Sequence, residues 1–285
     1  MLRRVLEIQA RLFFRGPRDV DANWQEVPDG PRALWLVPSQ AGARVILYIH
    51  GGGFVFGSPQ THQAMLARLA SRCKARAVLP TYARVPEARF PAPAKDVRAA
   101  WDGLRRAGIA AQDIVIGGDS AGGALVFALL AELCAEGRAL PAGVFGLSPL
   151  LDLTFSGRSF RENAGRDVLL PVQRASEMVQ LYLAGFNPSD PKISPLYADF
   201  QGAPPVWLCA SDTEILRDDS RRLVARLEAA NVQVTFREEH DLAHVWPLFQ
   251  NHLPEAQATI EALADWIKAL PLAAGSERLG REVEN

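Results

Sequence analysis

One serine of the chain lies in a turn motif that can present its hydroxyl for chemical attack. Gly118, Ser120 and Gly122 form the pattern Gly-x-Ser-x-Gly, which follows the apolar run 114–116 and precedes a small, apolar stretch. Between a strand and a helix this pattern is typical of a nucleophile elbow, where a sharp turn lifts the hydroxyl clear of a sheet. Because a serine hydroxyl is a weak nucleophile, it needs a base and an acid from elsewhere in the chain.

A glycine-rich loop can supply backbone N–H groups to a developing negative charge. The sequence His-Gly-Gly-Gly at 50–53 directly follows the apolar run 45–49. The N–H groups of Gly52 and Gly53, together with that of Ala121 after the serine, are predicted to form an oxyanion hole. A phosphate-binding loop is the alternative, but the segment lacks the Gly-x-Gly-x-x-Gly spacing and the Lys-Ser/Thr pair of such loops.

The base must be one of five histidines, and chain order selects among them. With a nucleophile elbow the expected order is serine, acid, and then histidine on a late loop. His240 and His244 share the loop after the last predicted strand, but His240 follows two glutamates and is expected to be solvated. We therefore predict that His244 is the base. His50 is expected to shape the glycine loop, and His62 lies on a polar helix start.

The acid is expected after the strand predicted at 206–210. Asp212 is the first choice by chemistry, because aspartate is the usual partner of the histidine. Glu214 lies two residues further on. Asp218 and Asp219 suit the first turn of a helix, where a carboxylate interacts favourably with the helix end. At this point the residues leave Asp212 and Glu214 open.

The elements that must position these groups alternate between strands and helices. Short apolar runs, typical of parallel strands buried on both faces, lie at 33–37, 45–49, 77–80, 114–116, 143–147, 206–210 and 232–237. Helices are predicted at 59–71, 93–107, 121–136, 172–183, 218–230 and 254–270, and an amphipathic helix at 1–14. This alternation predicts an α/β fold with a mostly parallel central sheet and helices on both faces.

The segment 155–194 interrupts the alternation and is predicted to lie over the carboxyl edge of the sheet, where α/β proteins bind ligands. We expect a single domain over residues 1–275, with a helical cap from about 1–20 and 155–194. A flexible tail is expected at 276–285. The side chains predicted to line the substrate pocket are Phe54, Phe56, Leu181 and Trp246, and the sequence fits a core position for each of them equally well.

Composition argues against several classes of protein. The 285 residues include 31 basic and 32 acidic side chains, so a net charge of −1 offers no electrostatic basis for nucleic acid or an anionic membrane as the main partner. Cys73, Cys134 and Cys209 form no Cys-x-x-Cys pair, which favours free thiols and a cytoplasmic location. The chain shows no metal-ligand cluster, no apolar run long enough to cross a membrane, and no signal-peptide cleavage site.

Taken together, the motifs resemble the bacterial hormone-sensitive-lipase-like branch of the α/β-hydrolases. The resemblance runs nearly end to end and is carried by the segments 50–53, 82–87, 90–92, 118–123, 148–152 and 194–196 and by His244. The family often reads Asp-Pro-Leu-Arg-Asp at the acid. Aligned from Pro204 without a gap, that aspartate falls on Glu214, which is 244 − 214 = 30 residues before the base. The resemblance therefore favours Glu214 as the acid, with Asp212 as the alternative.

The resemblance implies a serine carboxylesterase that hydrolyses short-chain or compact carboxylic esters through an acyl-enzyme, without metal or cofactor. A lactone hydrolase using the same groups is the alternative, since a lactone is a cyclic ester. A non-catalytic protein that binds a small ligand on the same scaffold belongs to another class, and His244 argues against it. The expected partner is a small-molecule ester, and a homo-oligomer is compatible with the sequence.

Overall fold

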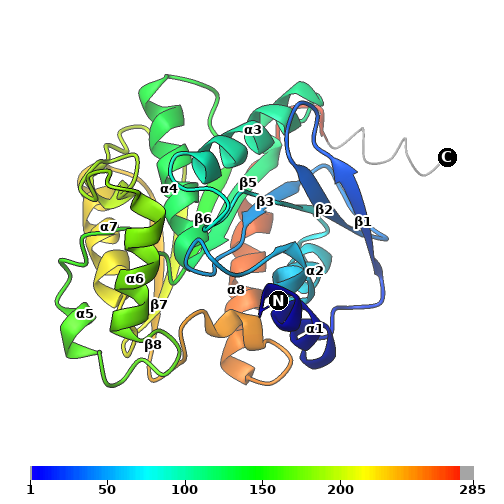
Figure 1. The fold of residues 1–285 in the computed structure, drawn as a ribbon. Coiled ribbons are helices and arrows are strands. Elements are labelled where there is room, and N and C mark those ends of the chain that lie inside the picture. The colour runs from blue at the N-terminus through cyan, green and yellow to red at the C-terminus, as the bar shows by residue number, and fades with distance from the viewer. Residues whose placement is uncertain (1, 277–285) are drawn as a thin grey trace.

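A mixed β-sheet runs through the centre of the molecule in the computed structural model, which describes residues 2–276 (Figure 1). Its eight strands have the order β1-β2-β4-β3-β5-β6-β7-β8. Antiparallel pairing is confined to β1 with β2 and β2 with β4, and the other described pairs are parallel. The strands are β1 (Val20–Glu26), β2 (Arg32–Pro38), β3 (Val45–Ile49), β4 (Arg76–Pro80), β5 (Ile114–Asp119), β6 (Gly143–Leu147), β7 (Val206–Ser211) and β8 (Val234–Glu239).

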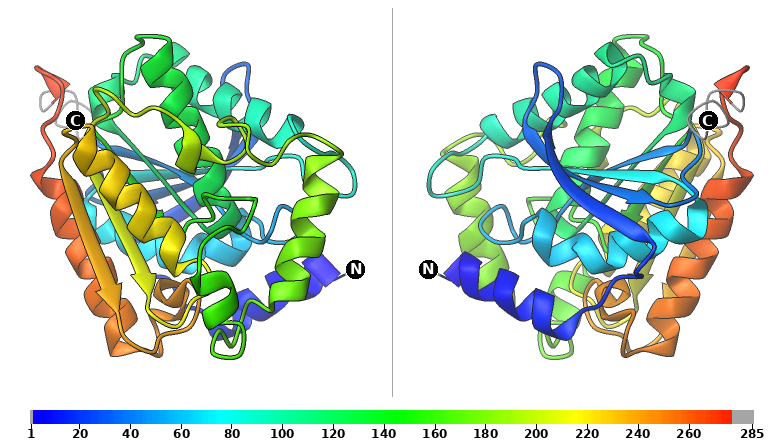
Figure 2. Two further views of the ribbon diagram at one scale, coloured as in Figure 1. Left: turned by 90° about the vertical axis from the view of Figure 1, so that its left-hand side faces the viewer. Right: turned by 90° about the vertical axis from the view of Figure 1, so that its right-hand side faces the viewer.

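Helices cover both faces of this sheet, and Figure 2 shows α7 and α8 on opposite sides of it. The α-helices are α1 (Leu2–Phe13), α2 (Pro59–Cys73), α3 (Ala92–Arg106), α4 (Ser120–Ala135), α5 (Ser159–Glu162), α6 (Val172–Leu183), α7 (Arg217–Ala229) and α8 (Pro254–Ala269). Short 3₁₀ helices lie at η1 (Ala111–Asp113), η2 (Pro195–Tyr197) and η3 (Trp246–Phe249). The predicted α/β fold is therefore confirmed.

The two-residue period of the buried strands explains why the sheet needs helices on both sides. In β3, Val45, Leu47 and Ile49 belong to the core beneath α3, α4 and α7. Ile46 and Tyr48 belong to the core beneath α2 and α8. Because successive side chains of a strand point to opposite faces, a strand that is apolar throughout must be covered twice.

The sheet differs from the prediction at its two edges. Strand β1 was not predicted, because this mostly exposed and polar strand, which pairs with β2, lacks a continuous apolar run. The last strand occupies Val234–Glu239 rather than 232–237. The tail predicted to be flexible lies outside the described residues, except for Ser276.

The C-terminal segment is fixed at the amino edge of the sheet. Arg44, buried directly before β3, donates hydrogen bonds to the carbonyls of Leu270 (2.6 Å) and Pro271 (2.9 Å). Asp113 accepts one from the Ser276 hydroxyl (2.6 Å). Between residues 2 and 276 no helix combines the length and apolar character that crossing a bilayer requires.

Candidate active site

Ser120 occupies the sharp turn between β5 and α4. Its φ of +48° lies in the left-handed region, which costs a residue with a side chain about 1–2 kcal/mol. The flanking glycines are required by close packing against β3. A Cβ on Gly122 would lie 2.1 Å from the Ile49 carbonyl oxygen, and one on Gly118 would lie 2.8 Å from the same atom.

Two further side chains extend from Ser120 in a continuous line of polar contacts. His244, on the loop after β8, places Nε2 3.0 Å from the Ser120 Oγ. Its Nδ1 lies 2.8 Å from Oε2 of Glu214, which follows β7. Both partners are largely withdrawn from water, with side-chain exposures of 10% for His244 and 1% for Glu214. The fold thus brings together a hydroxyl, an imidazole and a carboxylate that lie 30 to 124 residues apart in sequence.

The Glu214 carboxylate is held by its second oxygen. Oε1 accepts hydrogen bonds from the Ser148 hydroxyl (2.7 Å) and the Ser211 N–H (2.9 Å). These donors leave Oε2 free to face His244. Ser148 Oγ also accepts the Val245 N–H at 3.3 Å, so the same hydroxyl supports the residue next to the imidazole.

Asp212, the alternative acid, points to a different histidine. Its Oδ2 lies 2.6 Å from Nδ1 of His240, whose side chain is 82% exposed. Its Oδ1 accepts the Asp241 N–H. The structure therefore places Glu214, and not Asp212, against His244.

The environment of His244 alters its affinity for a proton. Burial disfavours the charged imidazolium, but the hydrogen bond and the negative charge of Glu214 outweigh this effect and raise the pKa of His244. A carboxylate that stabilises the imidazolium is what a general base requires when it accepts a proton.

The glycine loop has a backbone that other residues adopt only with strain. Gly52 and Gly53 have φ values of +115° and +60°. A Cβ on Gly52 would lie 2.5 Å from the Phe56 carbonyl carbon, and one on Gly53 would lie 2.4 Å from the Met178 sulfur. Both glycines line one cavity with Ser120. Ala121 is the second residue of α4, so its N–H belongs to the first turn, which has no acceptor within the helix.

A buried carboxylate ties the glycine loop to the turn. Asp119 Oδ1 accepts hydrogen bonds from the Gly51 N–H (2.9 Å) and the Tyr48 hydroxyl (2.8 Å). His62 Nε2 lies 3.2 Å from the same oxygen, and its side chain is 6% exposed. Burial opposes the charge on both groups, but their mutual attraction lowers the pKa of Asp119 and raises that of His62. His62 was predicted only to lie on a polar helix start, so its contact with Asp119 was not foreseen.

The cavity above Ser120 has a volume of about 1190 Å³ and is mainly apolar. Phe56 and Leu181 line it, as predicted. Phe54 and Trp246 do not, and these two pocket predictions are wrong. Phe54 is buried and stacks on Tyr182 at 3.7 Å between ring centroids. Trp246 is buried in the core beneath α2 and α8, and its indole N–H donates a hydrogen bond to the Thr259 hydroxyl.

Several residues that line this cavity were not predicted individually. They include Leu6 and Phe13 of α1, Met178 of α6, and Leu248 and Phe249 of η3. For α1 and α6 the amphipathic pattern gave the only signal, since one face of such a helix must be covered.

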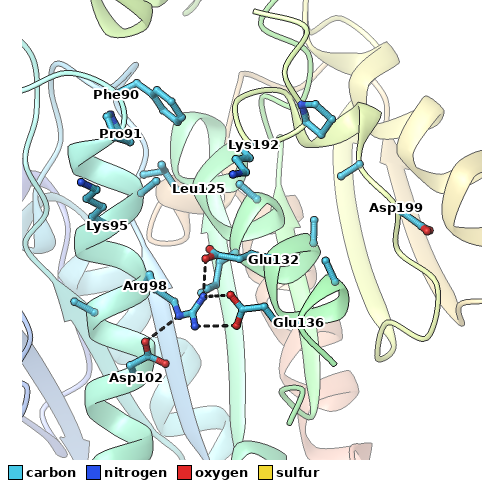
Figure 3. Close-up of a pocket in the computed structure, with 18 of the residues that line it drawn as sticks. Phe90, Pro91, Lys95, Arg98, Asp102, Leu125, Glu132, Glu136, Lys192 and Asp199 are labelled. Atoms are coloured by element: carbon cyan, nitrogen blue, oxygen red, sulfur yellow. Dashed lines mark hydrogen bonds and ion pairs between the residues drawn. The ribbon is translucent and has the colours of Figure 1, made fainter. Parts of the chain in front are cut away.

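A second cavity, of about 830 Å³, lies between α3 and α4 and contains neither Ser120 nor His244 (Figure 3). Arg98 lies in its wall and makes ion pairs with Asp102, Glu132 and Glu136 at 2.6–2.9 Å. The pairs with Glu132 and Glu136 connect α3 to the C-terminal end of α4. Within residues 2–276 there is no cluster of three or more side chains suited to hold a metal ion.

Comparison with known proteins gives consistent matches over most of the chain. A family model described as alpha/beta hydrolase fold matches residues 46–248. An "Acetyl-hydrolase" of Streptomyces hygroscopicus is 35% identical over 236 residues, which are 83% of this chain and 79% of that protein. An "Esterase" of Acinetobacter venetianus is 32% identical over 273 residues, or 95% and 89% of the two chains. The crystal structure of an esterase from the bacterial hormone-sensitive lipase family superposes with a TM-score of 0.90 at 38% identity, covering 94% of this chain and 90% of the other.

Proposed function

Because the chain belongs to the alpha/beta hydrolase family, and within it to the bacterial hormone-sensitive-lipase-like esterases, we propose that it hydrolyses esters through Ser120, His244 and Glu214. That the protein is a hydrolase acting on esters follows from its family. The proposal concerns the residues that perform the reaction and the order of the steps.

The first half of the reaction forms an acyl-enzyme. The Ser120 Oγ attacks the ester carbonyl carbon while His244 Nε2, 3.0 Å away, takes the hydroxyl proton. The carbonyl oxygen becomes an oxyanion. When the carbon–oxygen bond to the alcohol breaks, His244 returns the proton to the leaving oxygen. In the second half, water loses a proton to His244 and attacks the acyl carbon. The bond from that carbon to Ser120 Oγ then breaks, His244 returns the proton to Oγ, and the carboxylic acid leaves.

Glu214 is proposed to hold the tautomer of His244 that accepts a proton at Nε2. An ionised carboxylate can only accept a hydrogen bond, so Nδ1 of His244, which faces it, must carry the proton of the neutral ring. With Oε1 engaged by Ser148 and Ser211, the carboxylate cannot turn away without losing two hydrogen bonds. The same contact stabilises the imidazolium formed in each half-reaction.

The N–H groups of Gly52, Gly53 and Ala121 are proposed to bind the oxyanion. Each such donor typically lowers the barrier by about 3–4 kcal/mol, because it is already oriented when the charge forms. The contact from Gly51 N–H to Asp119 supports this orientation by fixing the start of the glycine loop.

We propose that the substrates are short-chain or compact carboxylic esters. The support for this is that residues of α1 and α6 line the space over Ser120, where Met178 lies directly against Gly53. A panel of p-nitrophenyl esters graded by acyl length, with lactones included, would rank the substrates. Preference for the lactones in that panel would favour the lactone hydrolase interpretation.

The observation that carries the proposal is the pair of contacts from Ser120 to His244 and from His244 to Glu214. The test is Ser120→Ala with p-nitrophenyl butyrate, combined with mass spectrometry of the wild-type protein treated with a fluorophosphonate. We expect hydrolysis to fall by a factor on the order of a million, and the label to be on Ser120. Full activity of the variant, or labelling at another residue, would refute the proposal.

A further inference from the structure

The large apolar side chains that remain exposed are confined to two segments. Among residues 2–276 there are nine of them. Five belong to α1: Leu2, Val5, Ile8, Leu12 and Phe13. The other four lie around α6: Val168, Leu169, Leu181 and Phe186. Such side chains are usually scattered over a protein surface, and a concentration of them marks an interaction site.

Both segments border the mouth of the cavity above Ser120. Phe13 of α1 and Leu169 and Leu181 beside or within α6 line that cavity and are also 48–63% exposed. The two views of Figure 2 place α1 and α6 on the same side of the molecule. We call these nine exposed side chains of α1 and of the segment around α6, three of which line the cavity, the docking face.

Helical spacing shows that α1 carries more apolar surface than the protein core uses. Ala10 is its buried residue, and Leu6 and Gln9 line the cavity. Val5, Ile8 and Leu12, spaced by three and four residues, form a separate stripe directed to solvent, and Leu12 is 70% exposed.

Positive charge borders this stripe. Arg4 and Arg11 lie four residues before and three residues after Ile8, on its polar side. Residues 2–18 contain five arginines and one glutamate, which gives 5 − 1 = +4, whereas the whole chain has a net charge of −1. Of these arginines, Arg3 pairs with Glu87, and the other four have no acidic partner in the described part of the chain.

We propose that the docking face binds an anionic lipid surface, with α1 lying in the plane of the interface and the cavity mouth open toward the lipid. A helix with an apolar stripe bordered by arginines is suited to such an interface, because the side chains enter the acyl boundary and the guanidinium groups meet phosphates. A second protein copy would have to accommodate the same positive charge on its own docking face. Ester substrates dissolved in the lipid would then reach Ser120 without crossing water.

The test is co-sedimentation with vesicles of phosphatidylcholine, alone or mixed with phosphatidylglycerol, at low and high salt. All proteins carry Ser120→Ala, so that no lipid ester is cleaved during the measurement. We expect binding to the mixed vesicles that decreases with salt. Ile8→Ser combined with Leu12→Ser should lower the partition coefficient at least about tenfold.

Charge reversal tests whether the arginines of α1 contribute to the binding of anionic lipid. Since each basic residue near an anionic surface changes partitioning about fivefold, Arg4→Glu with Arg11→Glu should lower binding to the mixed vesicles at least about 25-fold. The matched control is Arg106→Glu with Arg138→Glu, which changes the net charge equally at exposed positions outside the docking face. This control should lower binding less than threefold, a change small beside that expected for two arginines at the surface.

The outcomes separate this proposal from the serine mechanism. With Ser120 restored, all these variants should hydrolyse dissolved p-nitrophenyl butyrate at the wild-type rate, because none of the changed residues lines the cavity above Ser120. Absence of wild-type binding to the mixed vesicles, or equal loss in the control, would overturn the lipid proposal. So would a wild-type dimer that Ile8→Ser with Leu12→Ser converts to a monomer without any vesicle binding, since the occupant would then be a second copy.

Discussion

Replacing Glu214 by glutamine tests the proposed acid with almost no change of shape. The Ser148 hydroxyl and the Ser211 N–H both donate to Oε1, so the amide oxygen of a glutamine must take that position to keep both bonds. Its NH₂ group then faces Nδ1 of His244. An NH₂ group donates, so Nδ1 must lose its proton and Nε2 must carry it. The imidazole would donate to Ser120 instead of accepting from it.

The tautomer of His244 with its proton on Nε2 should lower kcat strongly. In serine proteases, replacing the triad acid by its amide lowers kcat by about 10⁴ through this effect, which corresponds to about 5–6 kcal/mol in the barrier. We expect a loss of the same order for Glu214→Gln, with KM little changed. The assay is kcat and KM for p-nitrophenyl butyrate, with thermal unfolding to show that the variant remains folded.

Asp212→Asn is the matched control for this substitution. Asp212 contacts the exposed His240 rather than His244, so its amide variant should keep its rate within about twofold, as expected for a surface pair. A large loss in Asp212→Asn together with a nearly normal Glu214→Gln would refute the assignment and the tautomer reasoning with it.

Three further predictions concern the turn, the loop and the base. Ser120→Gly should unfold at a temperature about 2–4 °C higher than Ser120→Ala, because glycine relieves the strain of φ +48°; equal midpoints in calorimetry would show that the turn is unstrained. Gly52→Ala should lower kcat on the order of 10²–10³-fold, since its Cβ would lie 2.5 Å from the Phe56 carbonyl carbon and displace a proposed oxyanion donor; unchanged kcat would exclude that N–H from the reaction. The acidic limb of kcat/KM, measured between about pH 5 and 9, should lie above the ordinary histidine pKa of about 6.5, because the neutral base is lost as pH falls through the raised pKa of His244; a limb below that value would contradict the described environment of the ring.

The order of strands and helices could be read from the sequence because most elements have a strong local signal. Runs such as 45–49 and 143–147 coincide with β3 and β6 as observed, since a strand buried on both faces must be apolar throughout. The edge strand β1 has no such requirement. Its polar, exposed residues are fixed by pairing with β2, which is a tertiary interaction that a local pattern does not contain.

The residues of the site also differ in how well the sequence predicts them. Gly52 and Ser120 stand in motifs whose spacing reflects backbone geometry, and His244 was selected by chain order; the structure brings the three together. Phe54 and Trp246 were predicted to line the pocket as apolar side chains, and the sequence alone fitted a core position for them equally well. The orientation of such a side chain decides whether it enters the core or the cavity. That orientation depends on packing between elements that are distant in sequence.

The hydrogen bonds from Arg44 to the carbonyls of Leu270 and Pro271 have a practical consequence for immobilising or fusing the protein. Arg44 precedes β3 at its amino end, whereas the glycine loop follows β3 at its carboxyl end. An anchor attached through the C-terminal segment would therefore leave the substrate opening directed away from the support. Truncating the chain before Leu270 would destabilise the protein, because the buried Arg44 guanidinium would lose two of its carbonyl acceptors.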